Sequence, residues 1–145
     1  LSDIVWNINP RYDDLKNLFV RMKRYAADML DGKNINGQFD FPEQAEKPLL
    51  LMTQRRDLYL IFKEAVNNLA KYSQAKNAVI SVRTGEQHIF LEVKDDGIGF
   101  DQKNTRAGNG LQNMQQRANA SGGIMSVQST PGEGTTINLE MKVTK

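Results

Sequence analysis

The apolar positions of this chain follow two different spacings, and the changes between them divide it into helices and strands. Apolar residues recur at the three- and four-residue spacing of amphipathic helices in residues 15–30, 53–72 and 111–118. A spacing of two, in segments rich in β-formers, predicts strands at residues 38–41, 79–83, 89–93, 124–129 and 135–143. Gly32 and Gly122 end two helices, and Gly85 joins a hairpin. This order predicts an α+β fold, a two-layer α/β sandwich whose helices cover one face of a mostly antiparallel sheet.

The chain has the length and composition of one domain. Its 145 residues are 39% hydrophobic, which is enough to bury a core, so we expect one compact unit over residues 11–145. Residues 4–10 form an apolar segment closed by Pro10, and we expect residues 1–10 to be a linker from an upstream helix. The opening residues have neither an initiator methionine nor the character of a signal peptide. We therefore expect the chain to be part of a longer protein.

Charge and cysteine content exclude several classes of protein. The net charge of +2 comes from interspersed Lys and Arg, so neither nucleic acid nor an anionic membrane is implied as a partner. The chain has no cysteine, which excludes a disulfide framework and thiolate metal sites and is compatible with a reducing cytosol. No apolar run approaches the ~18 residues that span a bilayer. These features favour a cytoplasmic location.

One face of the helix predicted at residues 53–72 carries side chains suited to phosphate and magnesium chemistry. At about 100° per residue, Glu64, Asn68 and Lys71 fall within roughly 60° of one another, away from the apolar stripe. An Asn side-chain oxygen is a hard ligand for magnesium. Glu64 is placed to hold a metal-bound water or accept a proton, and Lys71 to neutralise phosphate oxygens. Taken alone, the same stripe also fits a solvated helix face.

A second candidate segment follows a predicted strand. Asp95 ends that strand, and Gly97 and Gly99 let the backbone turn sharply and approach a flat ligand. An ionised Asp only accepts hydrogen bonds, so it can read the amino group of adenine, where guanine presents a carbonyl. This favours ATP over GTP. By itself the segment also fits a hairpin turn, whereas a calcium loop is excluded because the spaced ligands are missing.

Two further glycine-containing segments complete the candidate site. Gly108, Gly110 and Leu111 enter the third predicted helix, where the free N–H groups of a helix start favour phosphate oxygens. Gly134 and Thr135 could bring backbone and a hydroxyl against a base. Alone, each segment is an ordinary loop or turn. A P-loop and a dinucleotide-binding Rossmann fingerprint are excluded, because their glycine patterns do not occur.

In order and spacing, these four segments resemble the GHKL ATPase family, and within it the catalytic ATP-binding domain of bacterial sensor histidine kinases. The segments that look like the N box, the G1 box, the G2 box and the final glycine–threonine element are residues 64–72, 95–99, 108–111 and 134–136. The resemblance is close from residue 53 onward. A Glu opening the N box and the sequence of residues 110–118 look like the subgroup with short lids.

The resemblance implies a Bergerat-type fold that binds ATP with Mg2+. In such a fold Asn68 would ligate the metal, Glu64 would assist it or activate the acceptor, and Lys71 would meet phosphates. Asp95 would bind adenine and Tyr72 would flank the nucleotide. The other residues that would shape the pocket are Gly97, Gly99, Gly108, Gly110, Leu111 and Thr135. Asp96 stands where the family often has Asn, and adds a negative charge beside Asp95.

The resemblance also implies partners. Sensor kinases pass the γ-phosphoryl group to a histidine on a separate dimerisation domain, within a homodimer, and then to an aspartate of a response regulator. The only histidine here, His88, starts a predicted strand, and we expect it to be an ordinary surface residue and not the phosphoacceptor. Two alternatives stay open. One is another GHKL enzyme, such as an anti-sigma-factor serine kinase or a gyrase-type ATPase, and the other is a non-catalytic dimerisation or docking module.

Overall fold

The computed structural model describes residues 15–103 and 109–143 of the chain. The expected linker at residues 1–10 and the predicted pocket residue Gly108 lie outside the described residues. The elements in chain order are α1 (Leu15–Asp31), β1 (Asn36–Asp40), α2 (Met52–Tyr72), β2 (Asn77–Thr84), β3 (His88–Asp95), α3 (Asn109–Ala120), β4 (Gly123–Ser129) and β5 (Thr135–Lys142). Every helix and strand expected from the apolar spacing is therefore present.

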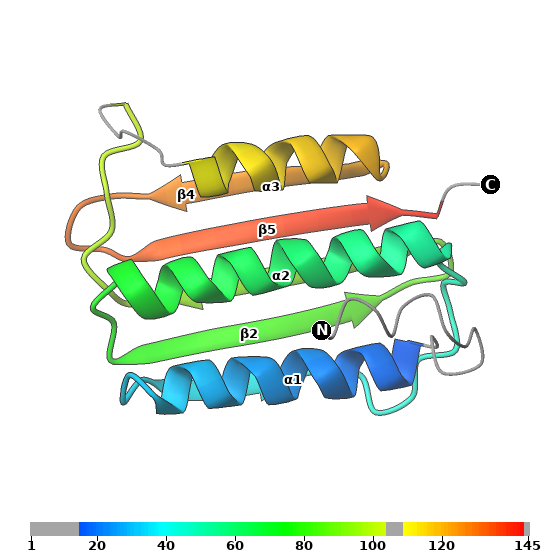
Figure 1. Ribbon diagram of the computed structural model, residues 1–145, viewed down its shortest axis with the longest axis horizontal. Helices are drawn as coiled ribbons and strands as arrows, with labels where there is room; N and C mark the ends of the chain where they lie inside the picture. The colour runs from blue at the N-terminus through cyan, green and yellow to red at the C-terminus, as the bar shows by residue number, and fades with distance from the viewer. Residues whose placement is uncertain (1–14, 104–108, 144–145) are drawn as a thin grey trace.

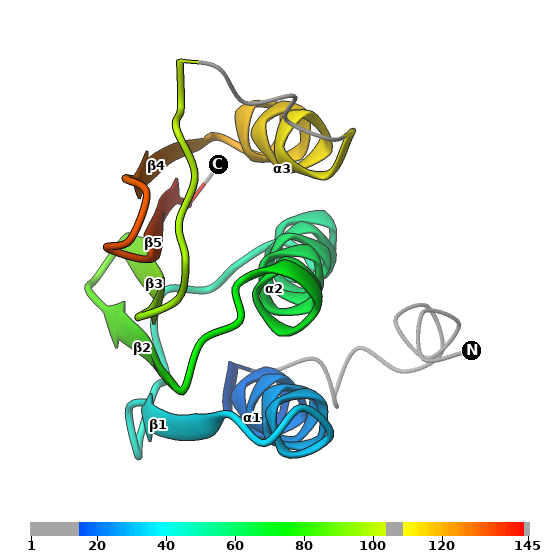
Figure 2. The ribbon, with the colours of Figure 1, turned by 90° about the vertical axis from the view of Figure 1, so that its left-hand side faces the viewer.

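The strands form one sheet with the helices on a single face. In the described residues the sheet has five strands in the order β1-β2-β3-β5-β4. Only the β1–β2 pair is parallel in this sheet, and the other neighbours are antiparallel. The helices α1, α2 and α3 lie side by side across one face, with α2 in the middle (Figures 1 and 2). The expected two-layer sandwich with a mostly antiparallel sheet is confirmed.

The core lies between the helices and the sheet. The expected apolar stripe of α2 is buried, and its members are Leu58, Phe62, Ala65 and Leu69. Alternate strand positions meet it from below, among them Ile80, Leu91 and Leu139, each at most 2% exposed. Because α2 turns this stripe toward the sheet, its polar stripe, roughly a quarter to a third of a turn away, faces sideways toward α3. None of the helices in the described ranges is long and apolar enough to cross a membrane.

Strand pairing brings the candidate segments to one end of the sheet. Asp95, the last residue of β3, pairs with Thr135, the first residue of β5. The C-terminal end of α2 lies at this same end of the sheet, and a short connection leads from it into β2 (Figure 1). The sheet register, which depends on contacts far apart in sequence, thus sets where the site is formed.

Candidate functional site

A cavity of about 630 Å³ opens between α2, α3 and the ends of β3 and β5. All four sequence segments of the candidate site contribute to it. The predicted residues that line it are Glu64, Asn68, Lys71, Tyr72, Asp95, Gly99, Gly110, Leu111 and Thr135. Of the predicted residues that the structure describes, Gly97 and Gly134 lie outside the lining. The structure therefore brings the separate motifs together around one space.

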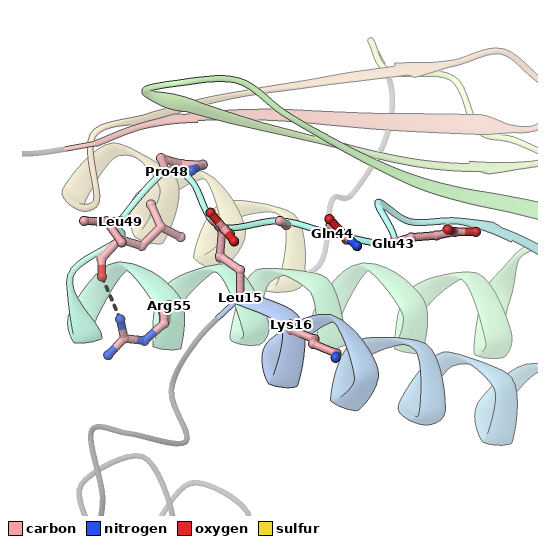
Figure 3. A pocket seen from close by; sticks show the side chains of 10 residues that line it. Leu15, Lys16, Glu43, Gln44, Pro48, Leu49 and Arg55 are labelled. Atoms are coloured by element: carbon pink, nitrogen blue, oxygen red, sulfur yellow. Dashed lines mark hydrogen bonds between the residues drawn. The ribbon is translucent and has the colours of Figure 1, made fainter.

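A second cavity of about 630 Å³ lies at the other end of the helical layer and contains none of the predicted residues. It is lined by the start of α1 and by the segment that precedes α2 (Figure 3). Arg55 also lines it and donates a hydrogen bond from Nη1 to the carbonyl oxygen of Leu50, at 2.7 Å (Figure 3). Leu49 at its rim is 77% exposed. Volume alone therefore does not distinguish the two cavities, and the chemistry of their linings does.

The polar stripe of α2 faces the first cavity. Glu64 and Asn68 are partly buried and Lys71 is exposed, and all three line the same wall. The helical spacing predicted that these side chains share a face, and the structure confirms it. An amide oxygen, a carboxylate and an ammonium group along one wall can together meet a metal ion, a water or acceptor, and phosphate oxygens.

The first turn of α3 approaches this wall closely at Gly110. A Cβ atom added to Gly110 would lie 3.2 Å from Asn68 Nδ2 and 3.2 Å from Glu64 Oε2. Both distances are shorter than ordinary contacts, so a side chain at this position would press on both polar groups. A helix start carries unpaired N–H groups and a partial positive charge. The arrangement places an anion-favouring helix end directly beside the polar stripe of α2.

Asp95 lies at the opposite wall of the cavity and is 7% exposed. Its Oδ1 accepts a hydrogen bond from the backbone N–H of Gly97 at 2.8 Å. Burial raises the pKa of the Asp95 carboxyl above its usual range, and backbone hydrogen bonds from Gly97 and Thr135 oppose the increase. A buried carboxylate held in this way is a fixed acceptor with free capacity, suited to an amino group on a planar ligand.

The neighbouring carboxylate of Asp96 serves a different purpose. Its Oδ1 accepts backbone hydrogen bonds from Lys76 and Asn77, both at 2.9 Å, and its Oδ2 accepts one from Asn77 Nδ2. The side-chain and backbone hydrogen bonds from Asn77 lower the pKa of Asp96, whereas burial raises that of Asp95. The two carboxyls therefore titrate in separate surroundings, and Asp96 anchors the start of β2.

The glycines after Asp95 pack against the protein's own backbone. A Cβ on Gly97 would lie 2.1 Å from the carbonyl oxygen of Ser73, and one on Gly99 would lie 2.2 Å from that of Thr130. Gly99 also has a φ of +61°, which side chains other than glycine adopt at a cost. Sequence reasoning assigned these glycines to close approach of a ligand. That role stays a prediction for Gly99, which lines the cavity. Gly97 does not line the cavity and packs instead against the backbone of Ser73.

Several cavity residues were not identified from the sequence. Val93 and Ile137 form an apolar wall from β3 and β5, and Asn113 adds an amide from α3. Asn113 lies three residues after Gly110, so helical spacing could have placed it on the same face. Val93 and Ile137 could not be identified from the sequence, because an inward-facing Val or Ile in a strand is indistinguishable from an ordinary core residue.

The positions of Tyr72 and His88 are compatible with their predicted roles, which are to flank the nucleotide and to be an ordinary surface residue. Tyr72 stands at the cavity edge with 68% of its surface exposed. His88 lies at the opposite end of β3 from Asp95, roughly 23 Å along the strand. Its Nε2 is 3.4 Å from Glu140 Oε2, and its ring stacks on Phe90. His88 is a partly exposed residue of the open sheet face, away from the cavity.

Comparison with known protein families places most of the chain in a family of ATPases. Residues 53–145 match the model of the family described as "Histidine kinase-, DNA gyrase B-, and HSP90-like ATPase". The matched range contains every predicted site residue and excludes α1 and β1.

Similar curated proteins are bacterial kinases much longer than this chain. The chain is 28% identical over 131 residues to the signal transduction histidine-protein kinase/phosphatase DegS of Brevibacillus brevis, covering 90% of this chain and 32% of DegS. It is 30% identical over 151 residues to the oxygen sensor histidine kinase NreB of Staphylococcus carnosus, covering 91% and 42%. The chain thus spans less than half the length of these curated relatives.

Solved structures share the fold. The histidine kinase AdeS of Acinetobacter baumannii aligns with a TM-score of 0.69 at 17% identity, covering 91% of this chain and 66% of AdeS. The full-length structure of ShkA in complex with AMPPNP aligns with a TM-score of 0.70 at 18% identity, covering 91% and 31%. At this identity the likeness supports the fold alone, and it agrees with the expected Bergerat-type architecture.

Proposed function

Because the chain belongs to the histidine kinase-, DNA gyrase B- and HSP90-like ATPase family, we propose that it is the ATP-binding catalytic part of a sensor histidine kinase. In this role it donates the γ-phosphoryl group of ATP to a histidine on a separate domain. The observation that carries the proposal is the convergence of three features on one cavity. These are the buried acceptor Asp95, the polar stripe at Glu64 and Asn68, and the start of α3 at Gly110.

The opposite walls of the cavity suit the two ends of the nucleotide. The adenine end belongs near Asp95, where a buried acceptor would take up the amino group and Val93 and Ile137 offer an apolar surface for the ring. The phosphate end belongs between α2 and α3, where Lys71 and the helix start of α3 favour negative charge. A cavity of about 630 Å³ lies within the range of small-molecule sites.

The residues at the phosphate end fit magnesium. The described part of the chain holds no group of three His, Asp or Glu side chains able to bind a metal. Mg2+ typically keeps several waters and takes few protein ligands beside phosphate oxygens, so the single amide oxygen of Asn68 matches its preferences. Bound there, the ion would neutralise charge on the phosphates. Glu64, one turn from Asn68, would orient a bound water or accept the proton of the acceptor imidazole.

Phosphoryl transfer on this scaffold depends on positioning and charge neutralisation. Lys71 neutralises phosphate oxygens, Asp95 fixes the base, and the start of α3 holds the phosphates in line with the acceptor. The acceptor histidine must come from elsewhere, because His88 lies at the far end of β3. We propose as partners the dimerisation and phosphoacceptor domain of the parent kinase, within a homodimer, and a response regulator. We propose a cytoplasmic location, where ATP is available.

Two adjacent carboxylates provide a matched test of the nucleotide site. Asp95→Asn removes the negative charge of a residue that lines the cavity and replaces one of its two acceptor oxygens with an NH2 donor. Asp96→Asn makes the same chemical change at a side chain that binds Lys76 and Asn77. In calorimetric titrations with Mg-ATP, we expect Asp95→Asn to abolish measurable binding and Asp96→Asn to bind like the wild type. Equal affinity in both variants would refute the proposed site.

The reaction requires a second test. The chain is incubated with γ-labelled ATP, magnesium and a supplied dimerisation domain, and the product is treated with acid or base. A phosphate that is lost in acid and stable in base supports histidine phosphorylation. The opposite stability would instead identify a serine kinase of the same family. Binding of Mg-ATP with no transfer to any dimerisation domain from a related kinase would contradict the kinase proposal.

A further inference from the structure

A buried polar cluster fastens the C-terminal end of α3 to the N-terminal half of α2. Asp57 is 8% exposed and accepts hydrogen bonds from the Ser121 hydroxyl and from Arg117 Nη1, the latter at 3.2 Å. One turn earlier, Gln54 is 2% exposed and donates to the carbonyl oxygens of Ser121 at 3.1 Å and Lys142 at 2.8 Å. A buried carboxylate is tolerated only where charge and hydrogen bonds compensate it. The cluster therefore demands a defined position of α3.

The cluster and the candidate site occupy the two ends of one helix–helix interface. The C-terminal half of α2 meets the start of α3, and the N-terminal half of α2 meets the end of α3, so the helices run antiparallel. Asp57 lies seven residues before Glu64 on α2, and Arg117 lies seven residues after Gly110 on α3. Seven residues make about two turns, or roughly 10 Å, on each helix. The two contacts are thus in register across the interface.

The contacts between these ends are apolar and adaptable. Met114 and Ala118 on α3 are at most 1% exposed and belong to the core. Apolar burial is non-directional, and an unbranched Met side chain repacks easily, so this part of the interface does not specify how far α3 is shifted along α2. A charge-assisted pair with hydrogen bonds is directional, and it does specify that position.

We propose that Asp57 is a positioning residue for the phosphate end of the nucleotide. By holding Arg117 and Ser121, it fixes α3 at the height along α2 where Gly110 meets Glu64. The inference rests on the proposed nucleotide site and extends it to a residue that lies outside the cavity lining.

Binding of the base and binding of the phosphates should depend differently on the position of α3 along α2. The adenine end is set by Asp95 and Thr135, which pair with each other in the sheet and do not belong to α3. The phosphate end depends on the distance from α3 to Glu64. Asp57→Asn keeps the size of the side chain and removes the charge that attracts Arg117. A small shift of α3 therefore lowers affinity for phosphates and leaves affinity for the base intact.

The test separates these two contributions. Wild type and Asp57→Asn are titrated with Mg-ATP by calorimetry and with adenosine by NMR chemical-shift changes. We expect the Kd for Mg-ATP to rise roughly tenfold in Asp57→Asn and the Kd for adenosine to stay within about twofold of wild type. The matched control is Tyr25→Phe, which removes the 2.9 Å hydrogen bond from Tyr25 Oη to Asn67 Oδ1 on the other flank of α2. This control should leave both constants unchanged.

Arg117→Gln provides a second variant, because its side chain is 40% exposed and more tolerant of change. It should show the same split between ligands, and the double variant should be no worse than either single one. Unchanged Mg-ATP affinity in Arg117→Gln, or an equal loss for both ligands, would overturn the inference while wild-type binding keeps the proposed function intact. A wild type that binds neither ligand would overturn the proposed function, and the inference with it.

Discussion

Gly110→Ala tests whether the close approach of α3 to α2 matters for the nucleotide or only for the fold. The added Cβ would lie 3.2 Å from both Asn68 Nδ2 and Glu64 Oε2. Ordinary contacts are about 3.5–4.0 Å, so either α3 or both of these side chains must move by roughly 0.3–0.8 Å. Alanine is a better helix former than glycine by at most about 1 kcal/mol, which offsets the crowding. We expect the free energy of unfolding to change by less than about 1 kcal/mol.

The effect on binding should be larger, because displacement occurs where the phosphates are held. Losing one hydrogen bond to a charged group costs about 1.5 kcal/mol, so the displacement of a single phosphate contact should weaken Mg-ATP binding about tenfold. The measurements are urea unfolding and calorimetric titration of the same preparations. The control is Gly85→Ala, where the nearest atom to the new Cβ is the His88 carbonyl oxygen at 3.9 Å. Wild-type affinity in Gly110→Ala would refute the reasoning, as would equal losses in both variants.

Three further predictions follow from burial and charge. Phe62→Ala should lower the free energy of unfolding by about 3–5 kcal/mol in urea titrations, because Phe62 is fully buried beneath α2, and a loss below about 1 kcal/mol would contradict the described core. Chelating magnesium with EDTA should weaken ATP binding and leave adenosine binding unchanged, and equal loss for both ligands would argue against a metal at Asn68. Asp95→Asn should raise the melting temperature at pH 7 because a raised pKa means that ionised Asp95 disfavours folding, whereas Asp96→Asn should lower it because a lowered pKa stabilises the fold. The higher melting temperature of Asp95→Asn should return to that of the wild type as pH falls through the raised pKa of Asp95. The lower melting temperature of Asp96→Asn should return to that of the wild type as pH falls through the lowered pKa of Asp96. Melting temperatures that shift in the same direction in both variants would contradict these assignments.

The elements and the polar stripe could be predicted because they depend on local spacing. The helical period put Glu64, Asn68 and Lys71 on one face, and the strand ending at Asp95 was visible from alternation and glycine. The fold class followed from the order of these elements. Asp95 lies beside Thr135 because β3 pairs with β5, and that pairing was not predicted. The family resemblance implied only that both segments contribute to one pocket.

Contacts between distant segments could not be predicted. Nothing in the sequence indicated that Gly97 packs on the Ser73 carbonyl, because a glycine indicates close approach without identifying the partner. It likewise did not show that Asp96 anchors Lys76 and Asn77. Asp57 was not identified, because a lone acidic residue on a helix usually faces water, and its burial depends on how α3 crosses α2.

The central claim is tested most directly by a crystal structure of the chain with magnesium and a non-hydrolysable ATP analogue. The account predicts the adenine amino group within hydrogen-bonding distance of Asp95, and the phosphates between Asn68 and the first turn of α3. The equally large cavity beside Leu49 and Arg55 provides the contrasting outcome. A nucleotide bound there, or one whose base lies away from Asp95, would contradict the account.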